Sequence, residues 1–142
     1  IIKQLYQTKS LSMLRLWGQA LAHITYQEDL GLVSTTITRD DFVRSGATEH
    51  ELYDIIDELI VNSPEEKMTL LLHEHVTEAT GEKVIHAILD VEKGLNALDL
   101  LVPFSPSGNA ARASFVLKHT TLIEAERHVT EHLRKEHNAL AI

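Results

Sequence analysis

The sequence predicts a mixed α/β domain, in which a mixed β-sheet of about four to five strands is flanked by helices and preceded by a long helix. Several stretches carry apolar residues at every third or fourth position, the spacing of a helix with one buried face. Between them lie apolar, β-branched runs without that period, which are typical of strands. The expected order is helix, strand, helices, strand, strand, helix, strand, helix, which indicates a layered domain.

The first helix is expected to run from residue 4 to about residue 25. Leu14, Trp17 and Leu21 recur along it at spacings of three and four, and further apolar residues widen this stripe. Residues 30–38 are rich in β-branched side chains and lack helical periodicity, so we expect them to form the first strand.

Two helices are expected after this strand. Thr38 can cap the first, and Gly46 is placed as a helix-ending glycine. Thr48 and Glu51 match the reciprocal capping pattern, in which each side chain bonds a backbone N–H of the other residue. The second helix is therefore expected to start there and to end before Pro64, because a residue that precedes proline disfavours helical backbone.

The next elements are a hairpin and a helix. Residues 68–76 and 83–89 are apolar runs joined by a turn-forming stretch, and we expect them to pair as antiparallel strands. Asp90 has a side chain that can cap a helix, whose apolar positions extend to Val102. Pro103 is expected to end that helix.

The last part of the chain is expected to be a loop, a short strand and a helix. Residues 104–114 have no period and are rich in small residues, as in a loop, and residues 115–118 suit a strand. Thr121 and Glu124 form another capping box at the start of the last helix. The residues expected on its buried face are Leu122, Ala125, Val129 and Leu133.

Composition narrows the classes of function. The chain has 142 residues, with 13 Lys and Arg against 21 Asp and Glu, so its formal net charge is −8. An acidic surface repels long nucleic acids but is compatible with a short phosphate ligand in one pocket. No apolar run reaches the roughly 20 residues that span a bilayer, so no membrane partner is expected. The absence of cysteine excludes disulfides, thiolate metal sites and a cysteine nucleophile, and we expect a cytoplasmic location.

Nine histidines raise the question of a metal site. His128 and His132 are four residues apart, a spacing that can hold zinc on one helix face, and His73 and His75 alternate along a strand. No third ligand accompanies the helical pair, so we expect solvated histidines and no metal. A serine hydrolase is not expected, because no Gly-x-Ser-x-Gly sequence occurs, and we predict no catalytic residue in this chain.

The segment 104–114 is the strongest candidate for a binding site. Its small residues permit close approach of the backbone to an anion. Ser105, Ser107 and Asn109 add donors, and Arg112 is the only nearby cation. A plain surface connection also needs small residues at its turns, and composition alone favours that interpretation.

Three short motifs carry a resemblance to a known family. They are Leu14-Arg-Leu-Trp-Gly-Gln-Ala-Leu21, Thr36-Ile-Thr-Arg-Asp-Asp-Phe42 and Gly108-Asn-Ala-Ala-Arg-Ala-Ser-Phe115. With the order of elements, they resemble the C-terminal substrate-binding domain of DHH-family phosphoesterases, over almost the whole chain. That superfamily includes RecJ-type exonucleases, oligoribonucleases (nanoRNases), pAp phosphatases and cyclic-dinucleotide phosphodiesterases.

The resemblance implies two lobes with separate tasks. Family members hold two Mn²⁺ ions in an N-terminal lobe, with Asp and His residues that include an Asp-His-His motif, and a metal-activated water attacks phosphorus. No Asp-His-His occurs here, and the first residue is Ile rather than Met. We therefore expect a piece of a longer, manganese-dependent hydrolase, with residues 1–26 as the helix from the missing lobe. Residues 27–142 would be the C-terminal domain, without a cofactor of its own.

The substrate loop of that family reads Gly-Gly-Gly-His, then two variable residues and Ala-Ala-Gly-Phe, and its amides and imidazole bind the substrate phosphate. Gly108 matches the last glycine and Phe115 the Phe, while Asn109 stands at the His. The upstream glycines fall on Pro106 and Ser107. Asparagine cannot carry a positive charge and proline has no N–H, so the loop departs from the family pattern in its phosphate-binding groups.

A second departure concerns charge. The stretch Arg112-Ala113-Ser114 replaces the family's Ala-Ala-Gly. The family also tends to place an arginine near the strand before the helix, and residues 84–89 contain none. Either Arg112 has taken over that charge, or phosphate binding has been lost.

The resemblance thus implies a domain that binds short oligonucleotides, nucleotides or small phosphate esters, which the missing lobe would hydrolyse as a phosphodiesterase or exonuclease. The residues expected to line its substrate side are Ser105, Ser107, Gly108, Asn109 and Arg112. The expected partners are the N-terminal lobe and the substrate, with a homodimer as a further assembly. The alternative is a degenerate, non-catalytic lobe that serves protein association or regulation.

Overall fold

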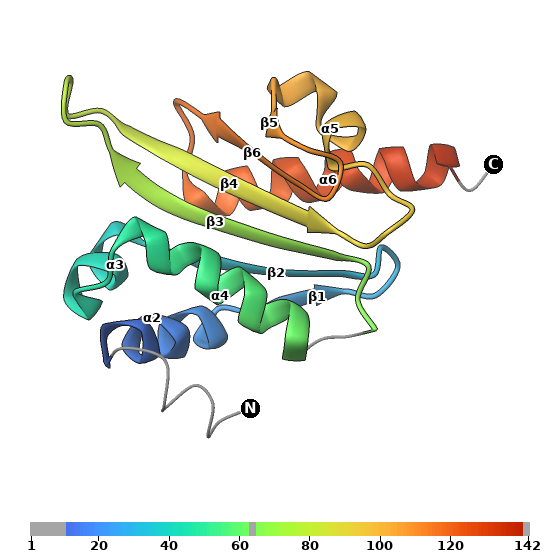
Figure 1. The fold of residues 1–142 in the computed structure, drawn as a ribbon. Coiled ribbons are helices and arrows are strands. Elements are labelled where there is room, and N and C mark those ends of the chain that lie inside the picture. Colours follow the sequence, from blue (N-terminus) through green and yellow to red (C-terminus); the bar gives the residue numbers. More distant parts are fainter. Residues whose placement is uncertain (1–10, 63–64, 141–142) are drawn as a thin grey trace.

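The computed structural model describes residues 11–62 and 65–140 (Figure 1). Its elements, in chain order, are α2 (Leu11–Ala22), β1 (Thr25–Gln27), β2 (Leu32–Ile37), α3 (Arg39–Ser45), α4 (Glu49–Asn62), β3 (Met68–Val76), β4 (Lys83–Val91), α5 (Ala97–Leu100), the 3₁₀ turn η1 (Val102–Phe104), β5 (Ser107–Gly108), β6 (Arg112–Leu117) and α6 (Leu122–Leu140). Within the described ranges, no helix combines the length and the apolar character that a membrane crossing requires.

The six strands form one mixed sheet, in the order β1-β2-β3-β4-β6-β5. Only β2 and β3 run parallel, and the other neighbours are antiparallel. The hairpin of β3 and β4 pairs Met68 with Val91 at one end and Val76 with Lys83 at the other. The expected mixed α/β class and the central hairpin are therefore confirmed.

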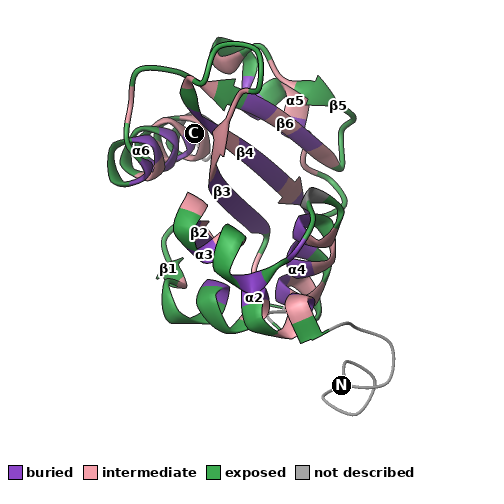
Figure 2. Ribbon diagram, turned by 90° about the vertical axis from the view of Figure 1, so that its left-hand side faces the viewer, coloured by how far each residue is buried: buried purple, intermediate pink, exposed green. Residues whose placement is uncertain are grey.

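Helices cover both faces of the sheet (Figure 1). The first face packs on α5 and α6, and the second packs on α2 and α4. Because β3 and β4 are covered on both sides, they read as nearly continuous apolar runs, and Figure 2 shows them buried between the two helical layers. The four residues expected on the inner face of α6 are all buried.

The capping residues found in the sequence start the helices. Thr38 Oγ1 accepts the backbone N–H of Asp41 at 3.0 Å, and Gly46 ends α3 with φ 74°. At the start of α4, Glu51 Oε1 accepts the backbone N–H of Thr48 at 3.1 Å. Local side-chain chemistry thus decides where these helices begin.

The prediction of a helix that starts at Asp90 is wrong. The backbone of Asp90 stays extended, because the residue pairs with Arg112 of β6 and carries β4 on to Val91. A helix of four residues, α5, begins only at Ala97, where Asn96 Oδ1 accepts a backbone N–H. The strand partner outweighs the capping tendency of an aspartate.

Two edge strands are also missing from the sequence-based expectation. The expected first helix ends at Ala22, and the chain turns into the short strand β1, which pairs with β2. The segment 104–114 contains β5 and the beginning of β6, so the last strand starts at Arg112 rather than at residue 115. Both strands exist only because a neighbouring strand supplies their hydrogen bonds.

The buried stripe of α2 differs from the expected one. Met13, Leu16 and Ala20 are buried, whereas Leu21 is 44% exposed. These buried residues share a core with α4, so α2 packs directly on the rest of the domain. The boundary between residues 26 and 27 stays a prediction, and the expected start of the first helix, residues 4–10, lies outside the described residues.

Candidate functional site

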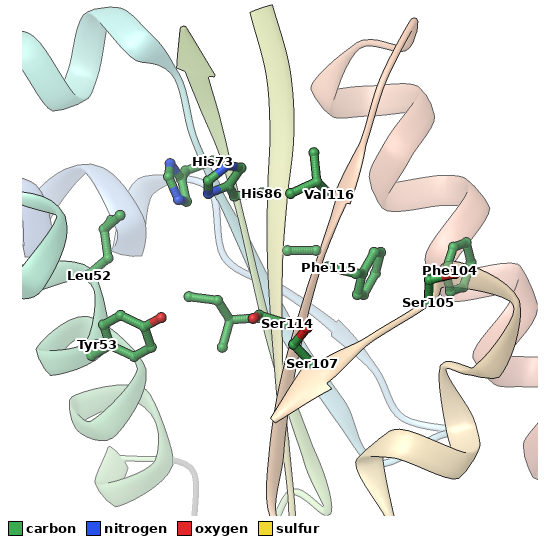
Figure 3. A pocket seen from close by; sticks show the side chains of 12 residues that line it. Leu52, Tyr53, His73, His86, Phe104, Ser105, Ser107, Ser114, Phe115 and Val116 are labelled. Carbon is green, nitrogen blue, oxygen red and sulfur yellow. The ribbon is translucent and has the colours of Figure 1, made fainter. Parts of the chain in front are cut away.

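A groove of about 490 Å³ opens on the second face of the sheet, where α2 and α4 stop short of β6 (Figure 3). Leu52 and Tyr53 of α4 line one side, and Ser105 and Ser107 line the other. Its floor comes from β3, β4 and β6. Val116 of β6, which lines the groove, is 45% exposed, so this part of the floor is open to solvent.

Three histidines meet at one end of this face. His73 on β3 lies directly opposite His86 on β4, with their ring centroids 5.0 Å apart. The ring of His75 lies 4.7 Å from that of His86 and 6.5 Å from that of His73. Alternation along β3 and the register of the hairpin therefore place three imidazoles on one face.

His73 differs from its two neighbours in being 4% exposed. Burial, followed by the nearby rings of His86 and His75, lowers the pKa of His73 to about 4. His73 is therefore neutral at neutral pH. In the part of the chain that the structure describes, no cluster of histidines and carboxylates has the arrangement of a metal site. The expected absence of a cofactor stays a prediction.

Arg112 lies on the same sheet face but is occupied by two carboxylates. Its Nε donates to Asp90 at 2.9 Å, and its Nη2 donates to Asp57 of α4 at 2.6 Å. Burial alone would lower the pKa of Arg112, but the hydrogen bonds to these carboxylates outweigh it and raise the pKa above its ordinary value. Arg112 thus stays charged and ties α4 to the sheet.

The loop between β5 and β6 is closed by Asn109. Its Oδ1 accepts the backbone N–H groups of Ala111 and Arg112 at 2.9 and 3.0 Å, and its own N–H donates to the carbonyl of Arg112. Gly108 has φ 134°, and a Cβ there would overlap the backbone of Arg112. Only glycine fits this close approach, whatever the loop binds.

The five candidate residues therefore separate into two groups. Ser105 and Ser107 line the groove (Figure 3). Gly108 and Asn109 shape the turn beside it, and Arg112 joins the carboxylates of two other elements. The structure brings the serines to the groove and places the other three next to it.

Sequence reasoning missed the other polar groups of the groove, which are His86, Tyr53 and Ser114. Only the pairing of β4 with β3 and β6 brings His86 and Ser114 to the same face. A signal was available for His86, because a hairpin centred on residues 77–82 places it across from His73. No comparable signal exists for Tyr53, which reaches the groove through helix packing.

The histidine pair of α6 serves packing. Phe104 stacks on Phe115 with ring centroids 4.7 Å apart, and the rings of His128 and His132 contact Phe104 edge-on. Nε2 of His132 also lies 2.7 Å from the carbonyl oxygen of Leu100. These contacts hold the turn after α5 against α6, and so position Ser105 at the groove.

Comparison with known proteins bears on the fold. No protein-family model and no curated protein matches the sequence. Among solved structures, an exopolyphosphatase-related protein from Bacteroides fragilis superposes with a TM-score of 0.77 and 16% sequence identity. The match covers 99% of this chain and 39% of the chain of that protein. A pGpG-specific phosphodiesterase from Vibrio cholerae superposes with a TM-score of 0.49 and 12% sequence identity. That match covers 93% of this chain and 40% of the chain of the phosphodiesterase.

The first of these matches shows a shared fold. The superposition includes nearly all of this chain, with a TM-score of 0.77. The chain spans about two fifths of the length of either protein. The mixed α/β fold is thus that of one part of an exopolyphosphatase-related protein.

Proposed function

We propose that this domain is the substrate-binding lobe of a DHH-type phosphoesterase and that it binds short oligonucleotides or small phosphate esters. Hydrolysis would take place in an N-terminal lobe that holds Mn²⁺. The observation that carries the proposal is the position of the groove. It opens beside the loop that resembles the family's substrate loop, in a fold shared with an exopolyphosphatase-related protein.

The groove has the chemistry for such a ligand. Hydroxyls of Ser105, Ser107 and Ser114 and the phenol of Tyr53 can donate hydrogen bonds to phosphate or ribose oxygens. The apolar part of the lining, which includes Ile88, suits the face of a base. In this proposal, the part of this chain in the reaction is to hold and orient the substrate.

Titration of the 142-residue chain with pAp and with a dinucleotide tests the proposal. We expect chemical-shift changes at Ser107 and Ser114, and weaker binding in a Ser107→Ala/Ser114→Ala variant. Thr120→Ala is the matched control, because it removes a hydroxyl outside the groove. Absence of binding at millimolar ligand, or equal losses in the groove variant and the control, would contradict the proposal.

One observation favours the alternative of a degenerate lobe for protein association or regulation. The charge of Arg112 is compensated by Asp57 and Asp90, and Pro106 supplies no N–H to the loop. In that case Arg112→Ala leaves the activity of the full-length protein unchanged, while a polar substitution of exposed Leu21 on α2 disrupts an assembly. A homodimer and a cytoplasmic location stay predictions.

A further inference from the structure

The histidines of β3 and β4 are the only groups of the described groove lining that can gain a positive charge near neutral pH. His73 and His86 line the groove directly, and His75 packs on His86. Figure 3 shows the imidazoles of His73 and His86 at one end of the groove, with Tyr53 on the α4 side. Arg112 supplies little net charge, because two carboxylates bind it.

The charged groups near these histidines are largely paired with one another. Glu74 of β3 binds Lys83 of β4, and Asp41 of α3 binds Arg44. On the side of β6, Arg112 binds its two carboxylates. Arg39 of α3 and His23, which follows α2, line a separate hollow beside Glu74 and Lys83. Among the described residues, no Lys or Arg lines the groove itself.

Helix α4 carries three titratable groups next to Leu52, which lines the groove. Tyr53 lines the groove itself. Glu51 accepts hydrogen bonds from the Ser12 hydroxyl and the Thr48 backbone, and Asp54 lies one helical turn further on. Carboxylates on this helix do not attract an anion. Strand β2 brings no charged residue to this face.

We propose that His86, whose ring packs against those of His73 and His75, is the phosphate-binding group of this groove. It binds anionic substrates in its protonated form, so binding is coupled to proton uptake at mildly acidic pH. The inference rests on the proposed function, because it assigns the phosphate contact within the same groove. It moves the cationic group from the loop, where Asn109 stands, to the sheet. Ser114 and Ser107 lie across the groove as neutral donors.

The physical reason is the mutual repulsion of the rings. Charged imidazoles at 4.7 to 5.0 Å repel each other, so the empty cluster resists taking up several protons. An anion bound next to His86 offsets this repulsion and stabilises the protonated imidazole. If binding takes up one proton, the logarithm of the association constant falls by up to 1 for each unit that the pH rises. The affinity then changes by up to about tenfold per pH unit.

Sulfate and a dinucleoside monophosphate are suitable probes, because both keep a constant charge between pH 5.5 and pH 8. We expect the 142-residue chain to bind each at least about tenfold more tightly at pH 5.5 than at pH 8. In His86→Gln this gain is lost. NMR spectra of the imidazole carbons are expected to show that sulfate perturbs His86 more than His137.

His137→Gln is the matched control, since it removes one histidine from α6 on the opposite face of the sheet. His75→Gln provides a second groove variant should His86→Gln fold poorly, and it is expected to reduce the pH dependence in part. Equal pH dependence in wild type, His86→Gln and His137→Gln would indicate general surface charge and overturn the inference. Tight binding that does not vary with pH would overturn it as well, and would leave the proposed function standing. Failure to bind at any pH overturns both.

Discussion

Replacement of Arg112 by Ala is expected to destabilise the domain, chiefly through the loss of one contact. Arg112 joins β6 to β4 through Asp90 and joins the sheet to α4 through Asp57. The two contacts differ in exposure. The side chain of Asp90 is 21% exposed and that of Asp57 is 60% exposed, while Arg112 itself is 28% exposed.

Exposure determines how much each contact contributes. A hydrogen bond to a charged group contributes about 1.5–3 kcal/mol when it is shielded from water. An exposed ion pair contributes about 0.2–1 kcal/mol. Because the pair with Asp90 is only partly shielded, we expect Arg112→Ala to lower the free energy of unfolding by about 2 kcal/mol. At about 3 °C per kcal/mol for a chain of this size, Tm falls by about 6 °C.

Urea and thermal unfolding, followed by circular dichroism, measure these changes. Asp57→Asn serves as the comparison, because it removes only the exposed contact, and it is expected to cost about 0.5 kcal/mol. The same variant leaves Arg112 less neutralised and should strengthen sulfate binding in the groove. A loss in Asp57→Asn as large as that in Arg112→Ala would refute the reasoning, since the shielded contact would then not dominate.

Three further predictions follow from burial and backbone geometry. Gly108→Ala forces a Cβ onto the backbone of Arg112, so the turn must distort; we expect weaker pAp binding in calorimetry and a small loss of Tm. For His73, whose pKa falls to about 4, the unfolded chain takes up a proton from about pH 6.5 downward while the folded chain does not. The free energy of unfolding should therefore fall between pH 6.5 and pH 4, by up to about 3 kcal/mol, and urea titrations of His73→Gln should show a flatter slope. Leu70→Ala, at a fully buried position, should cost about 3 kcal/mol in the same assay, and a loss below about 1 kcal/mol would contradict the packing described.

The fold was predictable where the signal lies within one element. Thr38 marks the start of α3 and Gly46 marks its end, each through a hydrogen bond to a residue three positions away. Such short-range contacts can be predicted from the sequence. The hairpin of β3 and β4 follows from two apolar runs and a short turn. The helix expected at Asp90 failed because the competing interaction, pairing with Arg112, comes from a strand 22 residues away.

The candidate site was predictable only in part, for a related reason. Ser105 and Ser107, which composition and resemblance suggested, line the groove, and their part in binding stays a prediction. The environment of Arg112 was not predictable, since Asp57 is 55 positions away and meets it only through the packing of α4. Tyr53 reaches the groove in the same way.

By itself, the sequence determined the mixed α/β class, the central hairpin and the starts of α3, α4 and α6, because each depends on periodicity or on hydrogen bonds between near neighbours. The tertiary structure alone decided which charges remain available in the groove. It pairs Arg112 with two carboxylates and gathers His73, His75 and His86 on one face. Charge pairing depends on distances between elements far apart in the chain, and strand register and helix packing set those distances.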